Sequence, residues 1–329
     1  MPEYNIVVTS NIDEEKRKVI KKVLENKQSQ VLFLSPNSDK KRKEMLKNAD
    51  VLLTLNPAYD LSEDEMDCLD NVRFMQLFSA GADHIPFQDI PEHITLASNT
   101  GAYAEPIAEH VVAMSLALAK RLMEEHKNMI KGEFNQFNGS SKFIKDATIG
   151  ILGFGGIGKA TARLFRAFGS RIFAMNTSGK SDEPTDFIGT TDDLEYILES
   201  SDVIVFSMPL TNKTRGLIGK RELEWTKKDA ILVNVARGEI INQKALFDHL
   251  KANPDFKAGL ESWWVEPLRH GKFKLEYPLL DLPNVLASPH NSSVVPGIMK
   301  HGIAEASENI KKYLNGEPFK GEINRDDYM

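Results

Sequence analysis

The chain has 329 residues, of which 41% are hydrophobic and 27% charged, a composition typical of a globular protein long enough for two domains. Its formal net charge of −6 argues against a nucleic-acid-binding surface as the main function, because phosphate binding requires a clustered excess of basic residues. Cys68 is the only cysteine, so no disulfide within the chain and no cysteine-based metal site is possible, and a reducing compartment is expected.

The start of the chain predicts neither a signal peptide nor a membrane anchor. Residues 1–10 run directly into an apolar strand pattern, without a basic start followed by a long apolar stretch. The longest apolar region, residues 107–119, contains Glu109 and His110 and is too short to span a bilayer. We therefore expect a cytoplasmic protein without a membrane partner.

Short apolar runs rich in β-forming residues alternate with charged helical stretches. The expected strands are residues 6–8, 31–34, 51–55 and 74–78, with helices at 14–26 and 39–48. The alternation resumes with expected strands at 148–152, 171–175, 203–208, 231–235, 258–260 and 285–287. This rhythm indicates βαβ units and parallel sheets. The predicted fold class is α/β, with two Rossmann-like or flavodoxin-like parallel-sheet domains and a cleft between them.

Two helical stretches connect the expected domains. Residues 105–131 read as one long helix that is apolar on nearly every side up to Ala119. Such a helix must be buried from several directions, so we expect it to pack on its own domain and on a second subunit, as in a homodimer; burial within one chain is the alternative. The last helix, expected at 294–315, should return with its polar tail to the first domain, so that two crossings form a hinge.

A glycine-rich loop joins the expected strand 148–152 to an expected helix at 159–168. It reads Gly153-Phe154-Gly155-Gly156-Ile157-Gly158, with the spacing G-x-G-x-x-G. In this context Gly153 allows a tight turn, Gly155 lets the backbone approach a pyrophosphate, and Gly158 lets helix and strand pack closely. The alternative is an ordinary tight turn. We expect residues 100–293 to form a dinucleotide-binding domain, and residues 1–99 plus 294–329 to form the substrate domain.

The residues after the expected strand 171–175 indicate which dinucleotide is favoured. A carboxylate there would bind the ribose hydroxyls of NAD. This chain instead has Asn176, Thr177, Ser178, Gly179 and Lys180, and the first acidic residue is Asp182. These side chains suit a 2′-phosphate through hydrogen bonds and charge. NADP(H) is therefore favoured, and NAD(H) remains possible.

Three residues that could carry out chemistry follow expected strands in the second half. They are Arg237, Glu266 and His290, and the carboxyl ends of parallel strands meet at the edge where α/β proteins bind ligands. Reducing a 2-oxo acid requires a cation for its carboxylate and an acid for its carbonyl oxygen, which suits Arg237 and His290. Glu266 would orient the imidazole and favour its protonated form. Taken singly, the three could be a salt-bridge partner, a solvated loop residue and a structural histidine.

Further motifs accompany these residues. They are Ser79-Ala80-Gly81-Ala82-Asp83-His84, Ala108-Glu109-His110, Pro209-Leu210-Thr211, Asn234-Val235-Ala236-Arg237-Gly238, Glu266-Pro267 and Ser288-Pro289-His290. With the glycine loop and the interval of 29 residues from Arg237 to Glu266, the chain resembles the D-isomer-specific 2-hydroxyacid dehydrogenases over nearly its whole length.

The resemblance implies roles for more residues. Backbone amides around Ala80 and Gly81 would hold the substrate carboxylate, and Pro209, Thr211 and Ala236 would line the cofactor. It also implies the catalytic trio Arg237, Glu266 and His290, and a homodimer whose long connecting helix packs at the interface.

The chain departs from the family pattern at several positions. Asn176 stands where NAD-preferring members carry Asp, and Glu261 replaces the Asp expected to contact the nicotinamide carboxamide. Tyr103 replaces a smaller polar residue near the substrate, and with Trp263 and Trp264 it could change the pocket shape, although loop tryptophans are more often packing residues.

The expected function is hydride transfer between NADP(H) and a small 2-oxo or 2-hydroxy acid, with glyoxylate or hydroxypyruvate as the leading substrates and D-stereospecificity. The alternative is a dinucleotide-sensing binding protein of the same fold, similar to the C-terminal-binding-protein corepressors. The fold and the site residues alone do not distinguish the enzyme from the binding protein, whereas turnover of a 2-oxo acid does.

Overall fold

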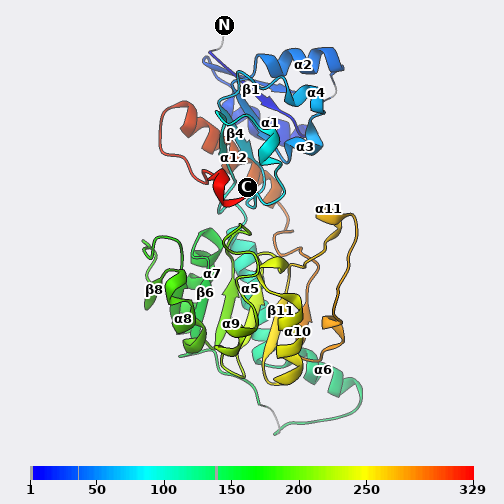
Figure 1. Cartoon of the computed structure of the whole chain (residues 1–329), viewed down its shortest axis with the longest axis vertical. Helices are drawn as coiled ribbons and strands as arrows, with labels where there is room; N and C mark the ends of the chain where they lie inside the picture. Colours follow the sequence, from blue (N-terminus) through cyan, green and yellow to red (C-terminus); the bar gives the residue numbers. More distant parts are fainter. Residues whose placement is uncertain (1–2, 36, 138–139) are drawn as a thin grey trace. The chain divides into compact units, whose positions relative to one another are not determined.

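The computed structural model describes residues 3–35, 37–137 and 140–329. Residue contacts divide the chain into two compact units, which are drawn in Figure 1. Unit 1 comprises Met1–Tyr103 and Val295–Met329, and unit 2 comprises Ala104–Val294.

Unit 1 is built on a five-stranded parallel sheet with the order β2-β1-β3-β4-β5. Its strands are β1 (Tyr4–Val8), β2 (Ser29–Phe33), β3 (Val51–Thr54), β4 (Phe74–Leu77) and β5 (Thr95–Ala97). This is the flavodoxin-like order. The short β5 was not predicted, because three residues carry little periodicity.

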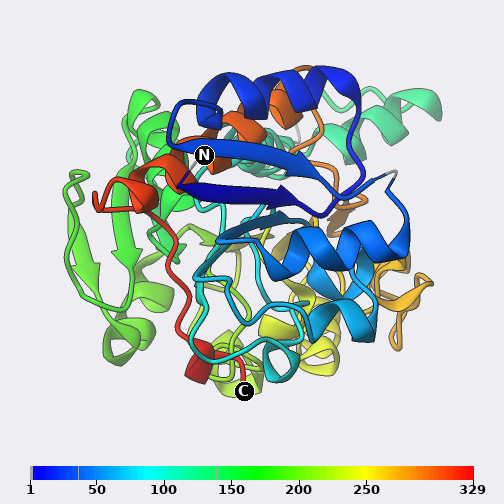
Figure 2. The same cartoon turned by 90° about the horizontal axis from the view of Figure 1, so that it is seen from above.

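Helices cover both faces of this sheet. On one face, α1 (Glu14–Leu24) and α12 (Ile298–Leu314) lie side by side, as Figure 2 shows. The other face is covered by α2 (Asp39–Lys47), α3 (Pro57–Asp60) and α4 (Glu63–Met66). Alternation along β1 produces the two cores, because Ile6 and Val8 pack with α12 while Val7 packs towards α2.

Unit 2 contains a seven-stranded parallel sheet with the order β12-β11-β10-β9-β6-β7-β8. Its strands are β6 (Thr148–Leu152), β7 (Arg171–Met175), β8 (Phe187–Gly189), β9 (Val203–Phe206), β10 (Ile231–Asn234), β11 (Lys257–Leu260) and β12 (Val285–Ala287). The direction of strand order reverses between β6 and β9. In doubly wound sheets, dinucleotides bind at the carboxyl ends of the strands beside such a reversal.

Both faces of the second sheet are also covered. The helices α5 (Ala104–Ala119) and α7 (Gly156–Ala167) pack on one face, and α8 (Leu194–Ser200), α9 (Lys220–Glu224) and α10 (Gln243–Ala252) pack on the other. The prediction of two parallel α/β sheets is therefore confirmed. No helix in the described ranges is long and apolar enough to cross a membrane.

Three helix predictions need correction. The stretch 105–131 is two helices, α5 and α6 (Leu122–Ile130), because the backbone of Arg121 turns to φ +54° between them. Helix α7 begins three residues earlier than expected, since two of the loop's glycines adopt helical geometry. Helix α12 begins at Ile298 rather than residue 294, after Gly297 at φ +83°.

Candidate active site

The glycine loop has the geometry of a phosphate-binding turn. Gly153 has φ +102°, and a Cβ there would lie 2.4 Å from the backbone nitrogen of Met208. A Cβ on Gly158 would lie 2.4 Å from the carbonyl oxygen of Gly153. A Cβ on Gly155 would meet nothing within 4 Å, and this residue precedes an α7 N-terminus that has no side-chain cap. Gly153 and Gly158 are thus required by the fold, while Gly155 leaves open space at the start of α7, where backbone N–H groups of a helix end can bind an anion.

The loop after β9 lies against the glycine loop. Ser207 Oγ donates to the carbonyl oxygen of Gly153 at 2.8 Å. Farther along, Thr214 Oγ1 donates to Pro209 O at 2.7 Å and accepts from Thr211 N at 2.8 Å. These contacts hold Pro209 and Thr211 in a defined turn beside the reversal of strand order.

Asn176 is engaged within its own loop after β7. Its Oδ1 accepts from the N–H of Gly179 at 2.8 Å and of Ser178 at 3.1 Å, and its Nδ2 donates to Lys180 O at 2.8 Å. The side chains of Thr177, Ser178 and Lys180 are exposed. Asp182 forms an ion pair with Lys159. Asn176 therefore shapes a loop whose exposed polar side chains extend beyond the end of β7.

Glu266 and His290 form an acid–base pair. Nδ1 of His290 lies 2.8 Å from Glu266 Oε2 and 2.9 Å from Oε1, and the backbone N–H of Trp263 donates to Oε1 at 2.7 Å. Glu266 is buried, whereas the His290 side chain is about one-third exposed. Since Nδ1 faces Glu266, Nε2 is the ring nitrogen left to face a substrate.

The surroundings of Glu266 keep it ionised. Burial alone would raise the pKa of Glu266, but the hydrogen bond and charge of His290, the Trp263 N–H and the charge of Arg237 together lower this pKa below its ordinary value. The charge of Arg237 is therefore one of the effects that keep Glu266 ionised. His290 and Arg237, the other two residues predicted to carry out the chemistry, thus both lower the pKa of the Glu266 carboxyl group.

The loop that carries Arg237 is shaped by Asn234 at the end of β10. Asn234 Oδ1 accepts from the N–H of Ala236 at 3.0 Å, and its Nδ2 donates to Arg237 O at 2.9 Å. A Cβ on Gly238 would lie 2.4 Å from the carbonyl carbon of Trp263, so the loop packs closely against the chain leading to Glu266.

Glu261 is fully buried directly after β11. Its Oε1 accepts from the N–H of Ser292 at 2.8 Å, whereas its Oε2 has no hydrogen-bond partner among the described residues. Burial raises the pKa of Glu261, with smaller opposing effects from His290 and Ser292. An unsatisfied buried oxygen of this kind suits a ligand that donates a hydrogen bond, such as a carboxamide.

The substrate-binding residues predicted in unit 1 lie near the end of β4. Within the described residues, no hydrogen bond engages the backbone N–H of Ala80 or Gly81. The hydroxyl of Tyr103 donates to Phe78 O at 2.8 Å, and its ring packs against Gly302 of α12. Burial raises the pKa of the Tyr103 phenol. In this structure Tyr103 holds Phe78, which directly follows β4 and lies two residues before Ala80 in the sequence.

Further residues support the site, and two of them, Trp263 and Trp264, were named from the sequence as residues that could change the pocket shape, with packing as the more common role of loop tryptophans. Trp263 is buried and its Nε1 donates to Ser288 O at 2.8 Å, while Trp264 Nε1 donates to Ile241 O at 2.7 Å, so both indoles act in packing. Arg269 forms a bidentate ion pair with Glu239 at 2.8 and 3.2 Å. The Arg269–Glu239 ion pair has no sequence signal and was missed, whereas Asn234 offered one, since Asn commonly stabilises turns through its own side chain.

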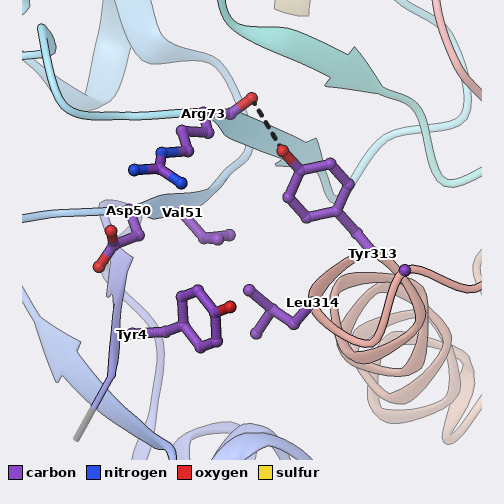
Figure 3. Close-up of a pocket in the computed structure, with 7 residues that line it drawn as sticks. Tyr4, Asp50, Val51, Arg73, Tyr313 and Leu314 are labelled. Carbon is purple, nitrogen blue, oxygen red and sulfur yellow. Dashed lines mark hydrogen bonds between the residues drawn. The ribbon is translucent and has the colours of Figure 1, made fainter.

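A pocket of about 220 Å³ in unit 1 lies elsewhere (Figure 3). It is lined by residues at the amino ends of β1, β3 and β4, namely Tyr4, Val51 and Arg73. Parallel sheets bind ligands at the opposite edge, where the strands have their carboxyl ends. The hydroxyl of Tyr313 donates to Arg73 O at 3.5 Å there. None of the predicted site residues lines this pocket, and we assign it no function.

The residues of unit 2 fit a nicotinamide dinucleotide. Gly155 leaves open space beside the uncapped start of α7, where a pyrophosphate would accept hydrogen bonds, and no residue in the described ranges donates to Glu261 Oε2. The Glu266–His290 pair follows the neighbouring strands β11 and β12. Unit 2 is therefore a dinucleotide-binding domain with acid–base groups at its ligand-binding edge, as in NAD(P)-dependent oxidoreductases.

Comparisons with known proteins identify the family. Residues 112–292 match the family model described as D-isomer specific 2-hydroxyacid dehydrogenase, NAD binding domain. The chain is 31% identical over 283 residues to a glyoxylate reductase from Thermococcus kodakarensis, covering 83% of this chain and 82% of the relative. The chain belongs to the D-isomer-specific 2-hydroxyacid dehydrogenase family, which confirms the predicted resemblance.

Two further similarities extend over most of the chain. A D-3-phosphoglycerate dehydrogenase from Methanocaldococcus jannaschii is 28% identical over 324 residues; these are 97% of this chain but only 59% of that protein. The crystal structure of a glycerate dehydrogenase related protein from Thermoplasma acidophilum has a TM-score of 0.63 at 30% identity, covering 94% of this chain and 99% of that one.

Proposed function

We propose that the chain is an NADP(H)-preferring dehydrogenase that interconverts a small 2-oxo acid and its D-2-hydroxy acid. Glyoxylate and hydroxypyruvate are the preferred candidates. The observation that carries the proposal is the buried Glu266 carboxylate hydrogen-bonded to Nδ1 of a partly exposed His290, with Arg237 acting on the same carboxylate. The names of similar proteins, glyoxylate reductase and hydroxypyruvate reductase, support this substrate class.

In the proposed mechanism, Arg237 binds the substrate carboxylate and polarises the 2-oxo group. A reduced nicotinamide dinucleotide held by unit 2 would supply the hydride for C2. His290 donates the proton from Nε2 to the carbonyl oxygen, and Glu266 holds Nδ1 and balances the charge of the imidazolium. In unit 1, the backbone N–H groups of Ala80 and Gly81 are the proposed substrate-binding groups.

The proposed cofactor contacts follow from the loops at the ends of β6, β7 and β9. The glycine loop binds the pyrophosphate, and Pro209, Thr211 and Ala236 line the dinucleotide. The exposed side chains of Thr177, Ser178 and Lys180 bind a 2′-phosphate on the loop that Asn176 shapes. Glu261 accepts a hydrogen bond from the nicotinamide carboxamide through Oε2. NAD(H) is the alternative cofactor.

The proposed assembly is a cytoplasmic homodimer that uses the surface around α6. Seven large apolar side chains between residues 122 and 143 are at least half exposed in the single chain: Leu122, Met123, Met129, Ile130, Phe134, Phe137 and Phe143. A concentration of this size marks an interaction surface, and a second copy of the chain is the proposed partner.

The direct test is oxidation of NADPH and of NADH, followed by absorbance, with glyoxylate, hydroxypyruvate, pyruvate and phenylpyruvate. We expect turnover with at least one 2-oxo acid and a higher kcat/KM for NADPH. A higher kcat/KM for NADH would contradict the cofactor proposal alone. If no combination of dinucleotide and 2-oxo acid gives turnover although a dinucleotide binds tightly, the proposal of an enzyme is rejected and a dinucleotide-sensing binding protein is favoured.

A further inference from the structure

The turn that carries His290 is held at three alternating residues. Trp263 Nε1 donates to Ser288 O at 2.8 Å, Glu266 binds Nδ1 of His290, and Glu261 Oε1 accepts from Ser292 N at 2.8 Å. All three holding residues belong to the segment that follows β11. The next strand, β12, ends at Ala287; the backbone N–H of Ser288 still donates to Leu260 O of β11 at 2.9 Å, and residues 289–292 lie beyond the strand pairing.

The backbone at His290 requires such support. Its φ is +55°, in the left-handed region that side chains other than glycine rarely adopt. A residue in this conformation persists only where its surroundings hold it, and strain of this kind is concentrated at functional sites. The contacts on either side of His290, at Ser288 and Ser292, therefore determine where the imidazole lies.

Glu261 makes the contact that follows His290 in the sequence, the hydrogen bond to Ser292. Its side chain is fully buried and uses one oxygen, Oε1, for the Ser292 N–H. An aspartate at this position would be one methylene shorter, and its carboxylate would fall short of Ser292 unless the turn moved. A glutamine would keep the length and the acceptor oxygen.

We propose that Glu261 is a positioning residue for His290: by holding the N–H of Ser292 it fixes the strained turn in which His290 binds Glu266 and directs Nε2 towards the substrate. The catalytic consequence rests on the proposed function. The positioning itself does not, because it concerns a hydrogen bond within this chain.

The test uses the full-length protein and two variants, Glu261→Asp and Glu261→Gln. The proton between His290 Nδ1 and the Glu266 carboxylate should resonate far downfield of the amide protons in a proton NMR spectrum, and its loss in His290→Gln assigns it. We expect Glu261→Asp to lose this resonance and to lower kcat by on the order of 10- to 100-fold, as for a misplaced catalytic group. Glu261→Gln should keep the resonance, whatever its effect on dinucleotide affinity.

A matched control is Glu195→Asp, which shortens an exposed glutamate on α8 and should leave the resonance and the rate unchanged. The proposal is overturned if Glu261→Asp keeps both the resonance and kcat, or if Glu261→Gln loses the resonance as completely as Glu261→Asp. If the parent protein shows the resonance but no turnover, the proposed function fails. In that case the presence or loss of the resonance in Glu261→Asp and Glu261→Gln still shows whether Glu261 positions His290.

Discussion

Two glutamates five residues apart, Glu261 and Glu266, show how local surroundings set the charge of a side chain. Both are buried, yet the pKa of Glu261 is raised by burial, while that of Glu266 is lowered because His290, Trp263 and Arg237 outweigh burial. When the surroundings shift the pKa values of two nearby carboxyl groups in opposite directions, the two groups commonly have distinct acid–base roles. Here it leaves Glu266 as the charged partner of His290.

The first prediction concerns His290. His290→Gln should lower kcat by about 100-fold or more, the usual contribution of a positioned general acid. Dinucleotide affinity, measured by fluorescence titration, should change little, because the lost group acts on the substrate carbonyl. His93→Gln, at an exposed histidine of unit 1, is the control and should retain the parent rate. A near-parental kcat in His290→Gln would remove His290 from the mechanism.

The second prediction concerns pH and stability. Because the folded-state pKa of Glu266 is depressed, its charge stabilises the fold above the unfolded-state pKa of about 4.3, and this contribution is lost as the pH falls through the folded-state pKa. The parent should therefore exceed Glu266→Gln in free energy of unfolding at pH 7, and the difference should shrink below pH 4. Urea unfolding at several pH values measures this, and a pH-independent difference would contradict the assignment.

At the scale of elements, the glycine loop separates residues needed for folding from a residue needed for binding. Gly153→Ala should destabilise the protein by about 2–4 kcal/mol, because a Cβ would meet the Met208 backbone at 2.4 Å in a left-handed conformation. Gly155→Ala should unfold at nearly the parent temperature, since its Cβ enters open space, but should weaken dinucleotide binding about tenfold or more. Calorimetry and fluorescence titration check the two effects. Parental dinucleotide affinity in Gly155→Ala would argue against the proposed pyrophosphate position.

Sequence periodicity predicted most of the sheet elements and much less of the connections. Strands such as Thr148–Leu152 and Arg171–Met175 were predicted with their observed bounds, because buried parallel strands are short continuous apolar runs. The break at Arg121 was missed, since a left-handed backbone at a residue other than glycine leaves no signal in the hydrophobic periodicity.

The candidate site shows the same division. Arg237, Glu266 and His290 were predicted because each follows a strand end, and in the structure His290 Nδ1 is hydrogen-bonded to the Glu266 carboxylate. The Ser292 contact of Glu261 could not be predicted, because it depends on the three-dimensional path of residues 288–292. The internal hydrogen bonds of Asn176 likewise appear only once its loop is folded.

At the scale of the whole molecule, the exposed apolar side chains between residues 122 and 143 predict self-association. Light scattering should give twice the mass of the 36.9 kDa chain. The double substitution Phe134→Asp and Phe137→Asp should shift the mass towards one chain, because charges at these exposed positions oppose burial. Tyr59→Asp, at an exposed aromatic residue of unit 1, is the control. A parent protein that remains a single chain at micromolar concentration would contradict the dimer.

The hydrogen that is transferred can be followed directly with an isotope. Hydroxypyruvate is reduced with NADPH deuterated at C4 of the nicotinamide on the transferred face, and the product is analysed by mass spectrometry and chiral chromatography. We expect the D-2-hydroxy acid with one deuterium at C2. A product of L-configuration, or one without deuterium at C2, would contradict direct hydride transfer in a D-specific site built around Arg237, Glu266 and His290.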